Sequence, residues 1–327
     1  MKVYFEADAD SALVRGRKVA VVGYGNQGRA QALNLRDGGV AVTVALPAES
    51  QSRSRAREDG FDVMTSAEAA ARADVAMMLA ADEDQARIYT EAVAPNLRTG
   101  GALGFAHGLN IRFGLIDPRP DLDVFLVAPK GPGTALRSEY EAGRGLIALY
   151  AVHRDATGEA EALALAYAGA IGSGRAGLIA TSFAEEAEAD LFNEAAVIWG
   201  AIPELIQAGF DTLVEAGFSP EVAYFECLTE VKLIADLIYE RGIAGMREAI
   251  SHTAEFGALS GGARIVTAET RTEMRRILRE VRNGNLVKAL LDDAEAGYPR
   301  LKASRAAAAA HPIEAVGRRL RDLAAKK

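Results

Sequence analysis

The first half of the chain alternates short apolar runs with alanine-rich segments that favour helices. The apolar runs are nearly continuous and lie at residues 19–22, 40–46, 75–79, 102–106, 124–128 and 146–152. Continuous apolar strands separated by helices are typical of a parallel sheet that is buried on both faces. The alternation therefore predicts an α/β domain with a Rossmann-type, doubly wound parallel sheet.

A glycine-rich segment at residues 169–177 ends this alternation. From Ser182 onward the pattern is that of long helices, with almost no strand pattern. A chain of 327 residues is long enough for two sizeable cores. We therefore predict an α/β domain at residues 1–181 and an all-α domain at residues 182–327.

Composition excludes several classes of protein. The net charge of -8 argues against nucleic-acid binding, which requires clustered cations. The single cysteine, Cys227, excludes an internal disulfide and a zinc site built from several thiolates. The first residues lack the pattern of a signal peptide, and no apolar run reaches the roughly 18 residues of a membrane span. A cytoplasmic protein without a membrane partner is the expectation.

The first apolar strand, residues 18–22, runs directly into a glycine-rich turn and then a helical segment. The turn consists of Gly23, Tyr24, Gly25, Asn26, Gln27 and Gly28. Gly23 permits a tight turn, Gly25 lets backbone amides approach a pyrophosphate, and Gly28 lets the helix pack against the strand. We expect a dinucleotide at this turn, which makes the first domain a dinucleotide-binding domain.

The loop after the second strand decides between NADH and NADPH in such domains, because acidic residues there bind a ribose hydroxyl and cations bind a 2'-phosphate. Here the loop carries both signals: Ser50, Ser52 and Arg53 could hold a phosphate, whereas Glu49 could repel one. A solvated polar loop is the alternative interpretation.

Two pairs of carboxylates in the second half have the spacing of one helical turn. Asp190 and Glu194 form one pair, and Glu226 and Glu230 form the other. Each pair lies in a segment rich in apolar residues, where like charges are costly unless a cation binds them. Carboxylate oxygens suit a hard ion such as Mg²⁺, so four carboxylates could hold two such ions. Two solvated acidic helix faces are the alternative.

Two further polar residues follow apolar strands. His107 follows the run at residues 102–106, and Lys130 follows the run at residues 124–128. In open α/β sheets the carboxyl ends of strands face the ligand, so both are candidate site residues, with a surface loop as the alternative. Three acids upstream of Asp190, namely Glu185, Glu186 and Glu188, are interpreted as helix N-terminal acids favoured by the helix dipole.

Several motifs together resemble ketol-acid reductoisomerase (acetohydroxy acid isomeroreductase) in its short, class I form. They are GYGNQGRAQALNLRDGG, FAHGLNI, APKGPG, ADLFNE, AYFECLTEVKLIADLIYERGIAGM and SHTAEFG. The resemblance covers essentially the whole chain. It implies a Rossmann domain followed by a knotted helical domain, and a homodimer, possibly within a higher oligomer, in which each active site is shared. It also implies two Mg²⁺ ions, held by Asp190 and Glu194 of one subunit and by Glu226 and Glu230 of the partner subunit.

The same resemblance implies an activity. A Mg²⁺-dependent alkyl migration in 2-acetolactate or 2-aceto-2-hydroxybutyrate would be followed by reduction with NADPH or NADH, giving a 2,3-dihydroxy acid of valine and isoleucine biosynthesis. His107, Lys130 and Glu230 would be catalytic, and Ser251 would bind the substrate carboxylate. Gly133, in the turn that follows Lys130, is expected to contact the cofactor.

The chain departs from the short forms of the family at the cofactor loop. Pro47 and Gln51 stand where these forms usually have cations, and Glu49 adds a negative charge. We expect a relaxed preference for NADPH or tolerance of NADH.

Two departures concern the substrate. Trp199 replaces a cysteine that borders the alkyl pocket in the family, and His252 replaces an asparagine next to Ser251. Trp199 would alter the substrate range, unless it packs in the helical core. Two other functions stay open: a paralogue acting on a different 2-ketoacid, and a catalytically silent nucleotide-binding protein.

Overall fold

The computed structural model describes residues 2–324, so residues 1 and 325–327 at the ends of the two predicted domains lie outside it. The chain divides into two compact units, Met1–Ala189 and Asp190–Lys327. The division falls inside helix α9 (Phe183–Asn193), eight residues after the end of the predicted first domain.

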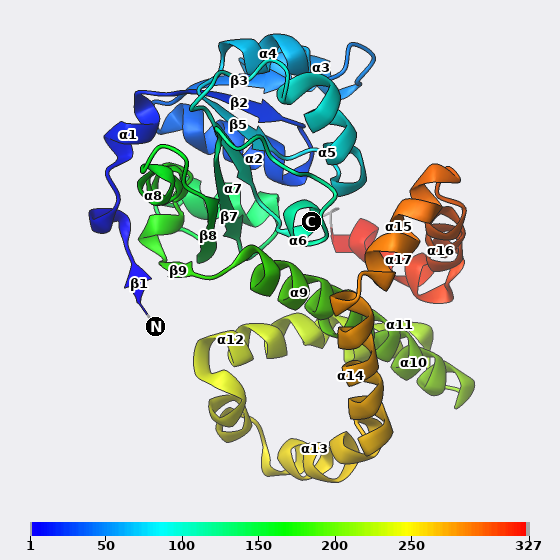
Figure 1. Cartoon of the computed structure of the whole chain (residues 1–327). Helices are drawn as coiled ribbons and strands as arrows, with labels where there is room; N and C mark the ends of the chain where they lie inside the picture. The colour runs from blue at the N-terminus through cyan, green and yellow to red at the C-terminus, as the bar shows by residue number, and fades with distance from the viewer. Residues whose placement is uncertain (1, 325–327) are drawn as a thin grey trace. The chain divides into compact units, whose positions relative to one another are not determined.

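Unit 1 is built on one nine-stranded sheet with the order β1-β9-β8-β7-β6-β5-β2-β3-β4 (Figure 1). The strands are β1 (Val3–Tyr4), β2 (Lys18–Val22), β3 (Ala41–Ala45), β4 (Asp62–Met64), β5 (Val75–Met78), β6 (Ala102–Phe105), β7 (Asp123–Pro129), β8 (Ala148–Arg154) and β9 (Leu178–Ala180). All six predicted apolar runs form strands.

The sheet is parallel from β4 through β7, as predicted, but it is mixed overall. Strand β8 runs antiparallel to β7, and β1 runs antiparallel to β9. Ala148 pairs with Pro129, so the chain re-enters the sheet at the end where β7 leaves it. The predicted parallel arrangement thus holds from β4 through β7, and β8 departs from it. The sequence does not reveal this departure, because a buried strand has the same apolar pattern in either direction.

Helices cover both faces of this sheet. They are α1 (Ser11–Arg15), α2 (Asn26–Asp37), α3 (Ser52–Glu58), α4 (Ser66–Arg72), α5 (Asp82–Ile88), α6 (Leu109–Arg112), α7 (Gly133–Glu141) and α8 (Ala160–Ala170). Successive residues of β2 enter different cores: Val19 and Val21 pack with α2 and α8, whereas Ala20 and Val22 pack with α4. Because side chains on both faces of β2 are buried, the sequence of this strand is continuously apolar.

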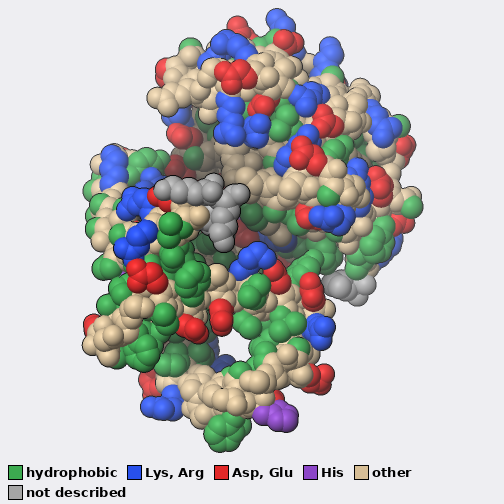
Figure 2. Space-filling model, turned by 180° about the vertical axis from the view of Figure 1, so that it is seen from behind, with side chains coloured by type: hydrophobic (Ala, Val, Ile, Leu, Met, Phe, Trp, Pro, Cys, Tyr) green, Lys and Arg blue, Asp and Glu red, His purple; other side chains and the backbone are tan. Residues whose placement is uncertain are grey.

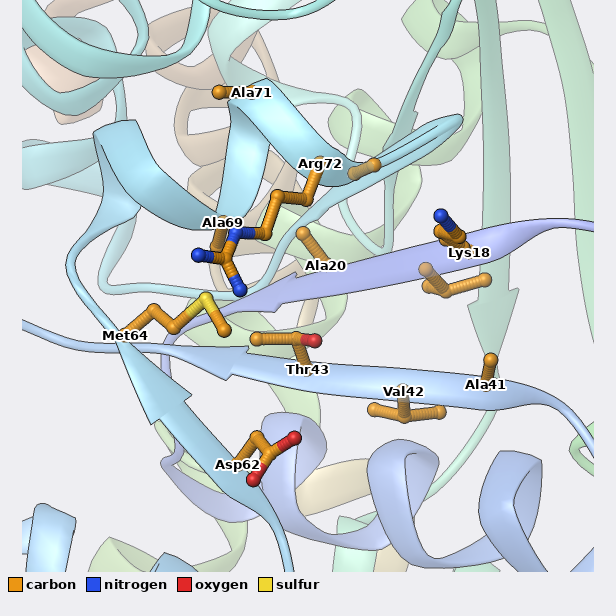
Figure 3. A pocket seen from close by; sticks show the side chains of 12 residues that line it. Lys18, Ala20, Ala41, Val42, Thr43, Asp62, Met64, Ala69, Ala71 and Arg72 are labelled. Atoms are coloured by element: carbon orange, nitrogen blue, oxygen red, sulfur yellow. The ribbon is translucent and has the colours of Figure 1, made fainter.

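A groove of about 610 Å³ lies where α4 leaves part of β2, β3 and β4 uncovered (Figure 3). Its floor includes Ala20 and Thr43, and the guanidinium of Arg72 reaches over it. The lining residues come mainly from the amino-terminal parts of the strands. The groove is therefore at the opposite end of the strands from the glycine-rich turn, and it is not the expected dinucleotide site.

Helices are the only regular elements in the described residues of unit 2, 190–324. Beyond α9 it contains α10 (Ala201–Glu215), α11 (Pro220–Tyr224), α12 (Glu230–Ala249), α13 (His252–Ile265), α14 (Ala268–Arg282), α15 (Asn285–Glu295), α16 (Pro299–Ala310) and α17 (Pro312–Ala324). Two π-helical turns, η4 (Glu194–Ile198) and η5 (Phe225–Thr229), precede α10 and α12. The alanine-rich run at residues 306–310 belongs to α16 and is exposed.

The core of unit 2 is small and involves α10, α11 and α17, with Phe210, Tyr224 and Val316 among its buried residues. Helices α12, α13 and α14 instead form an open ring (Figure 1). No residue of α12 or α13 is buried within this chain. Figure 2 shows hydrophobic side chains around the opening of this ring.

None of the helices in residues 2–324 combines the length and the apolar character that crossing a membrane requires.

Candidate active site

The glycine-rich turn joins β2 to α2 and has the close packing that the sequence predicted. Gly23 has φ of +106°, and a Cβ there would lie 2.5 Å from the backbone nitrogen of Ala80. A Cβ on Gly28 would lie 2.4 Å from the carbonyl oxygen of Gly23. Gly25 precedes the first turn of α2, and a Cβ there would meet no atom within 4 Å. Only Gly25 therefore faces open space, next to the amides that begin α2.

The next two residues of the turn bind the neighbouring loop between β7 and α7. The backbone N–H of Gly133 donates to Asn26 Oδ1, and Gln27 Nε2 donates to the carbonyl oxygen of Gly131 at 2.9 Å. A Cβ on Gly133 would lie 2.0 Å from the carbonyl oxygen of Asn26. These contacts give Asn26, Gln27 and Gly133 a structural role. Contact between the cofactor and these residues stays a prediction.

The loop after β3 is held by Arg53 of α3. Arg53 Nη1 donates to the carbonyl oxygen of Leu46 at 2.7 Å, and Nη2 donates to that of Val63 at 3.2 Å. Ser50 Oγ accepts a hydrogen bond from the Ser52 backbone at 3.3 Å, while Glu49 is exposed. The guanidinium of Arg53 is thus used in fastening the loop to β3 and β4, a role that the sequence interpretation did not foresee.

His107 and Lys130 meet at one buried carboxylate, that of Glu186 on α9. His107 Nδ1 lies 3.1 Å from Glu186 Oε2, and Lys130 Nζ lies 2.9 Å from Oε1. The backbone N–H of Gly108 also donates to Oε2, at 2.7 Å. A Cβ on Gly108 would lie 2.3 Å from the carbonyl oxygen of Phe183, so the glycine permits α9 to begin against this turn.

The Glu186 side chain is only 1% exposed. Burial by itself raises the pKa of this carboxyl, but the hydrogen bond from His107 and the charge of Lys130 outweigh burial, so that its pKa lies below the ordinary value. Glu186 therefore stays ionised as the shared partner of two site residues. Glu186 does lie in the first turn of α9, as the sequence indicates, but the sequence interpretation did not foresee that its carboxylate binds His107 and Lys130. Only its position one turn before Asp190 on the same helix face could have suggested this.

Helix α9 continues from Glu186 to the first predicted carboxylate pair. Carboxylate oxygens of Glu186 and Asp190 lie within 4.8 Å of one another. Asp190 is half-buried, and the exposed Glu194 begins the π-helical turn η4. Such turns are rare and frequently occur at functional sites.

The second pair belongs to the π-helical turn η5 and the start of α12. Glu226 and Glu230 are exposed within this chain. Of the other predicted site residues in unit 2, Ser251 caps α13 by accepting a hydrogen bond from the Ala254 backbone at 3.2 Å. Trp199 is 65% exposed, so the alternative that it packs in the core of this chain is wrong. His252 is exposed as well.

Comparisons with known proteins cover both units of the chain. Residues 13–177 match the family model described as "Acetohydroxy acid isomeroreductase, NADPH-binding domain", and residues 183–326 match "Ketol-acid reductoisomerase, C-terminal domain". The structure is similar to that of an NADH-preferring ketol-acid reductoisomerase from an uncultured archaeon. The sequences are 41% identical, 99% of each chain is covered, and the TM-score is 0.96.

More distant structures share the fold alone. A semialdehyde dehydrogenase NAD-binding protein from Cupriavidus necator is 20% identical, with a TM-score of 0.63 over 82% of this chain and 99% of that one. A putative oxidoreductase from Jannaschia sp. CCS1 is 13% identical, with a TM-score of 0.61 over 81% and 97%.

Together, the nine-stranded α/β unit, the helical second unit and the two matched family models determine the assignment. The chain belongs to the ketol-acid reductoisomerase family in its short form, and it is an NAD(P)H-dependent enzyme of branched-chain amino-acid biosynthesis.

Proposed function

We propose that the active site combines Glu186, His107 and Lys130 with two Mg²⁺ ions held by Asp190, Glu194, Glu226 and Glu230. The substrate is 2-acetolactate or 2-aceto-2-hydroxybutyrate, and the product is the corresponding 2,3-dihydroxy acid. The observation that carries this proposal is the buried Glu186 carboxylate with His107 and Lys130 bonded to its two oxygens. Burying the ionised Glu186 carboxylate is costly, which favours a functional reason for the cluster.

The donor set fits Mg²⁺. All four proposed ligands are carboxylates, and hard oxygen donors are those that Mg²⁺ prefers. When bound, the two ions would polarise the ketone of the substrate and acidify its hydroxyl, which promotes migration of the alkyl group.

The chain's own residues orient the reacting groups. A proton on His107 Nδ1 would be donated to Glu186 Oε2, which fixes the orientation and the tautomer of the ring. Lys130 Nζ is held beside the same carboxylate and supplies a fixed positive charge. Ser251 would bind the substrate carboxylate through its hydroxyl.

A second copy of the chain is proposed to complete each site. Glu226 and Glu230 lie beside and on α12, a helix of 20 residues with no buried residue within one chain. Leu233 and Tyr239 on this helix are 63% and 90% exposed, and Phe256 on α13 is 71% exposed. Apolar surface of this extent indicates a partner, and a homodimer would cover both the apolar side chains and the carboxylates.

We propose that the enzyme accepts NADH. The Arg53 guanidinium donates hydrogen bonds to backbone carbonyl oxygens of the protein. Most of its donors would have to break these bonds in order to bind a 2'-phosphate. Glu49, exposed in the same loop, would repel that phosphate and could accept from a ribose hydroxyl. One similar structure is that of an NADH-preferring ketol-acid reductoisomerase, which supports the proposal.

A paralogue with a different 2-ketoacid substrate is the second candidate, and Trp199 is the observation that favours it. The indole is exposed within one chain and would be available to narrow an alkyl pocket. Relative turnover of 2-acetolactate and 2-aceto-2-hydroxybutyrate by the wild type and by Trp199→Cys tests this: an unchanged ratio would remove the second candidate. A cytoplasmic location is proposed as well, because the single cysteine suits a reducing compartment.

The main experiment follows oxidation of NADH and of NADPH with 2-acetolactate, with and without Mg²⁺. Glu226→Gln is expected to lose at least about 100-fold in kcat, since a metal ligand is weakened. Glu240→Gln on the same helix removes an equal charge from an exposed position and is the matched control. Full activity of Glu226→Gln, or full activity without divalent ions, would contradict the metal assignment.

A further inference from the structure

Asp59 joins the glycine-rich turn to the helix that follows the cofactor loop. It directly follows α3, and its side chain is 18% exposed. Tyr24 Oη donates to Asp59 Oδ2 at 2.8 Å. Arg29, in the first turn of α2, donates to both oxygens, from Nε at 2.7 Å and from Nη2 at 2.9 Å. One carboxylate thus accepts three hydrogen bonds from the turn and its helix.

Further contacts hold the backbone around Asp59 to α2. Arg36 Nη1 donates to the carbonyl oxygen of Asp59, and the Arg36 guanidinium lies 5.2 Å from the centre of the Phe61 ring. The Tyr24 ring, whose residue is 5% exposed, packs edge-on against Phe61 with 6.0 Å between ring centres. The segment from Asp59 to Phe61 is therefore fastened to the glycine-rich turn by charge and by packing.

The other end of α3 is fastened to the sheet by Arg53, through the carbonyl oxygens of Leu46 and Val63. The loop at residues 47–51 lies between β3 and α3, so it is fixed at both ends. Asp59 is the link that fixes this assembly relative to the turn at Gly25. A dinucleotide held by the turn at its pyrophosphate would meet the loop at its adenosine ribose.

We infer that Asp59 is a positioning residue for the dinucleotide: it sets the spacing between the pyrophosphate turn and the adenosine loop, and thereby the affinity for the cofactor. The inference rests on the proposed cofactor site. Arg29 is the main cause that lowers the pKa of Asp59 below its ordinary value, so the carboxylate is charged at neutral pH. Its effect on the cofactor is indirect, since its oxygens bind Tyr24 and Arg29.

The test uses the full-length enzyme and the variant Asp59→Asn, which keeps the shape of the side chain and removes its charge. Binding of ADP-ribose is measured by isothermal titration calorimetry, and KM and kcat for NADH are measured with 2-acetolactate and Mg²⁺. Glu58→Gln, one residue earlier and exposed, removes the same charge from the end of α3 and serves as the control.

We expect Asp59→Asn to weaken ADP-ribose binding and to raise the KM for NADH by about tenfold, with kcat within about twofold of the wild type. Glu58→Gln should behave as the wild type. Arg29→Gln should reproduce most of the loss, and adding Asp59→Asn to it should cost little more, because both remove one interaction.

Unchanged ADP-ribose binding in Asp59→Asn, with or without lower thermal stability, would overturn the inference. So would an equal loss in kcat, because a positioning effect on the cofactor loop should appear in KM. Calorimetry with ADP-ribose requires no turnover, so a failure of the proposed reaction is distinguishable from a failure of this inference. If Asp59→Asn does not fold, Arg29→Gln with the same measurements decides.

Discussion

Substitution by alanine should lower thermal stability at Gly28 and cofactor affinity at Gly25, although both glycines belong to one turn. An alanine at Gly28 places its Cβ 2.4 Å from the Gly23 carbonyl oxygen, whereas ordinary contacts begin at 3.4 Å. Helix α2 would have to move by about 1 Å away from the turn, in a region that is closely packed. An alanine at Gly25 meets no atom within 4 Å, and its φ of -79° is open to any residue.

The magnitudes follow from these distances. Overpacking costs about 1–3 kcal/mol, and the better helix propensity of alanine returns somewhat less than about 1 kcal/mol, so Gly28→Ala should lower Tm by about 4 °C. Gly25→Ala should leave Tm within about 2 °C, since no clash occurs. Its methyl group would instead occupy the approach to the first amides of α2 and cost one or two charge-assisted hydrogen bonds, a loss of about 100-fold in NADH affinity.

Differential scanning calorimetry of the cofactor-free protein measures Tm, and a fluorescence titration measures the Kd for NADH. Wild-type NADH affinity in Gly25→Ala would refute the assignment of the pyrophosphate to this turn. An unchanged Tm in Gly28→Ala would refute the close approach of α2 to Gly23.

Four further outcomes are expected. Phe256→Asp should weaken dimerisation, measured by sedimentation equilibrium, because burying a phenylalanine that is 71% exposed contributes about 3 kcal/mol per copy, whereas Phe5→Asp in unit 1 should leave it unchanged. Removing Mg²⁺ with EDTA should also raise the dimer Kd, and equal Kd values with and without Mg²⁺ would oppose shared metal sites. Gly242→Ala should lower stability by about 1–3 kcal/mol in thermal unfolding, because Gly242 has φ 70° and ψ 173°, which only glycine adopts readily. Because the pKa of Asp59 is depressed in the folded state, its stabilisation is present above the ordinary value of 3.8 and is lost as the pH falls through the lower folded pKa. Asp59→Asn should therefore be less stable than the wild type in urea at pH 7. The difference in unfolding free energy should shrink as the pH falls below 3.8 and through the folded pKa of Asp59.

The sequence predicts the strands of unit 1 well where they are long and apolar. The six runs it identifies all form strands, because burial on both faces leaves a continuous apolar signal. Strands β1, β4 and β9 are missed, since segments of two or three residues carry no measurable periodicity. The direction of β8 is missed as well, because direction depends on where α7 returns the chain and not on the pattern of the strand.

The site is predicted less completely, because the partners of a polar side chain come from distant parts of the chain. Glu186 has the local setting of a helix N-terminal acid, yet its partners His107 and Lys130 are 79 and 56 residues away. Arg53 has the setting of a phosphate ligand, yet it donates to the carbonyl oxygens of Leu46, directly after β3, and of Val63 in β4. In both cases the residue type indicates a charge, and the tertiary packing determines what that charge binds.

Unit 1 and unit 2 differ in how much of their surface one chain can bury, and this difference is relevant to catalysis. Unit 1 packs its own helices on both faces of its sheet, and its glycine-rich turn is formed by residues of a single chain. Helices α12 and α13 bury none of their residues, and Glu226 and Glu230 lie at the start of this same surface. A partner that covers the apolar side chains would also remove water from the carboxylates, and their repulsion would then require cations. Hydrophobic assembly and metal binding would thus be one process, in which the energy from burying side chains such as Phe256 offsets the cost of bringing the carboxylates together.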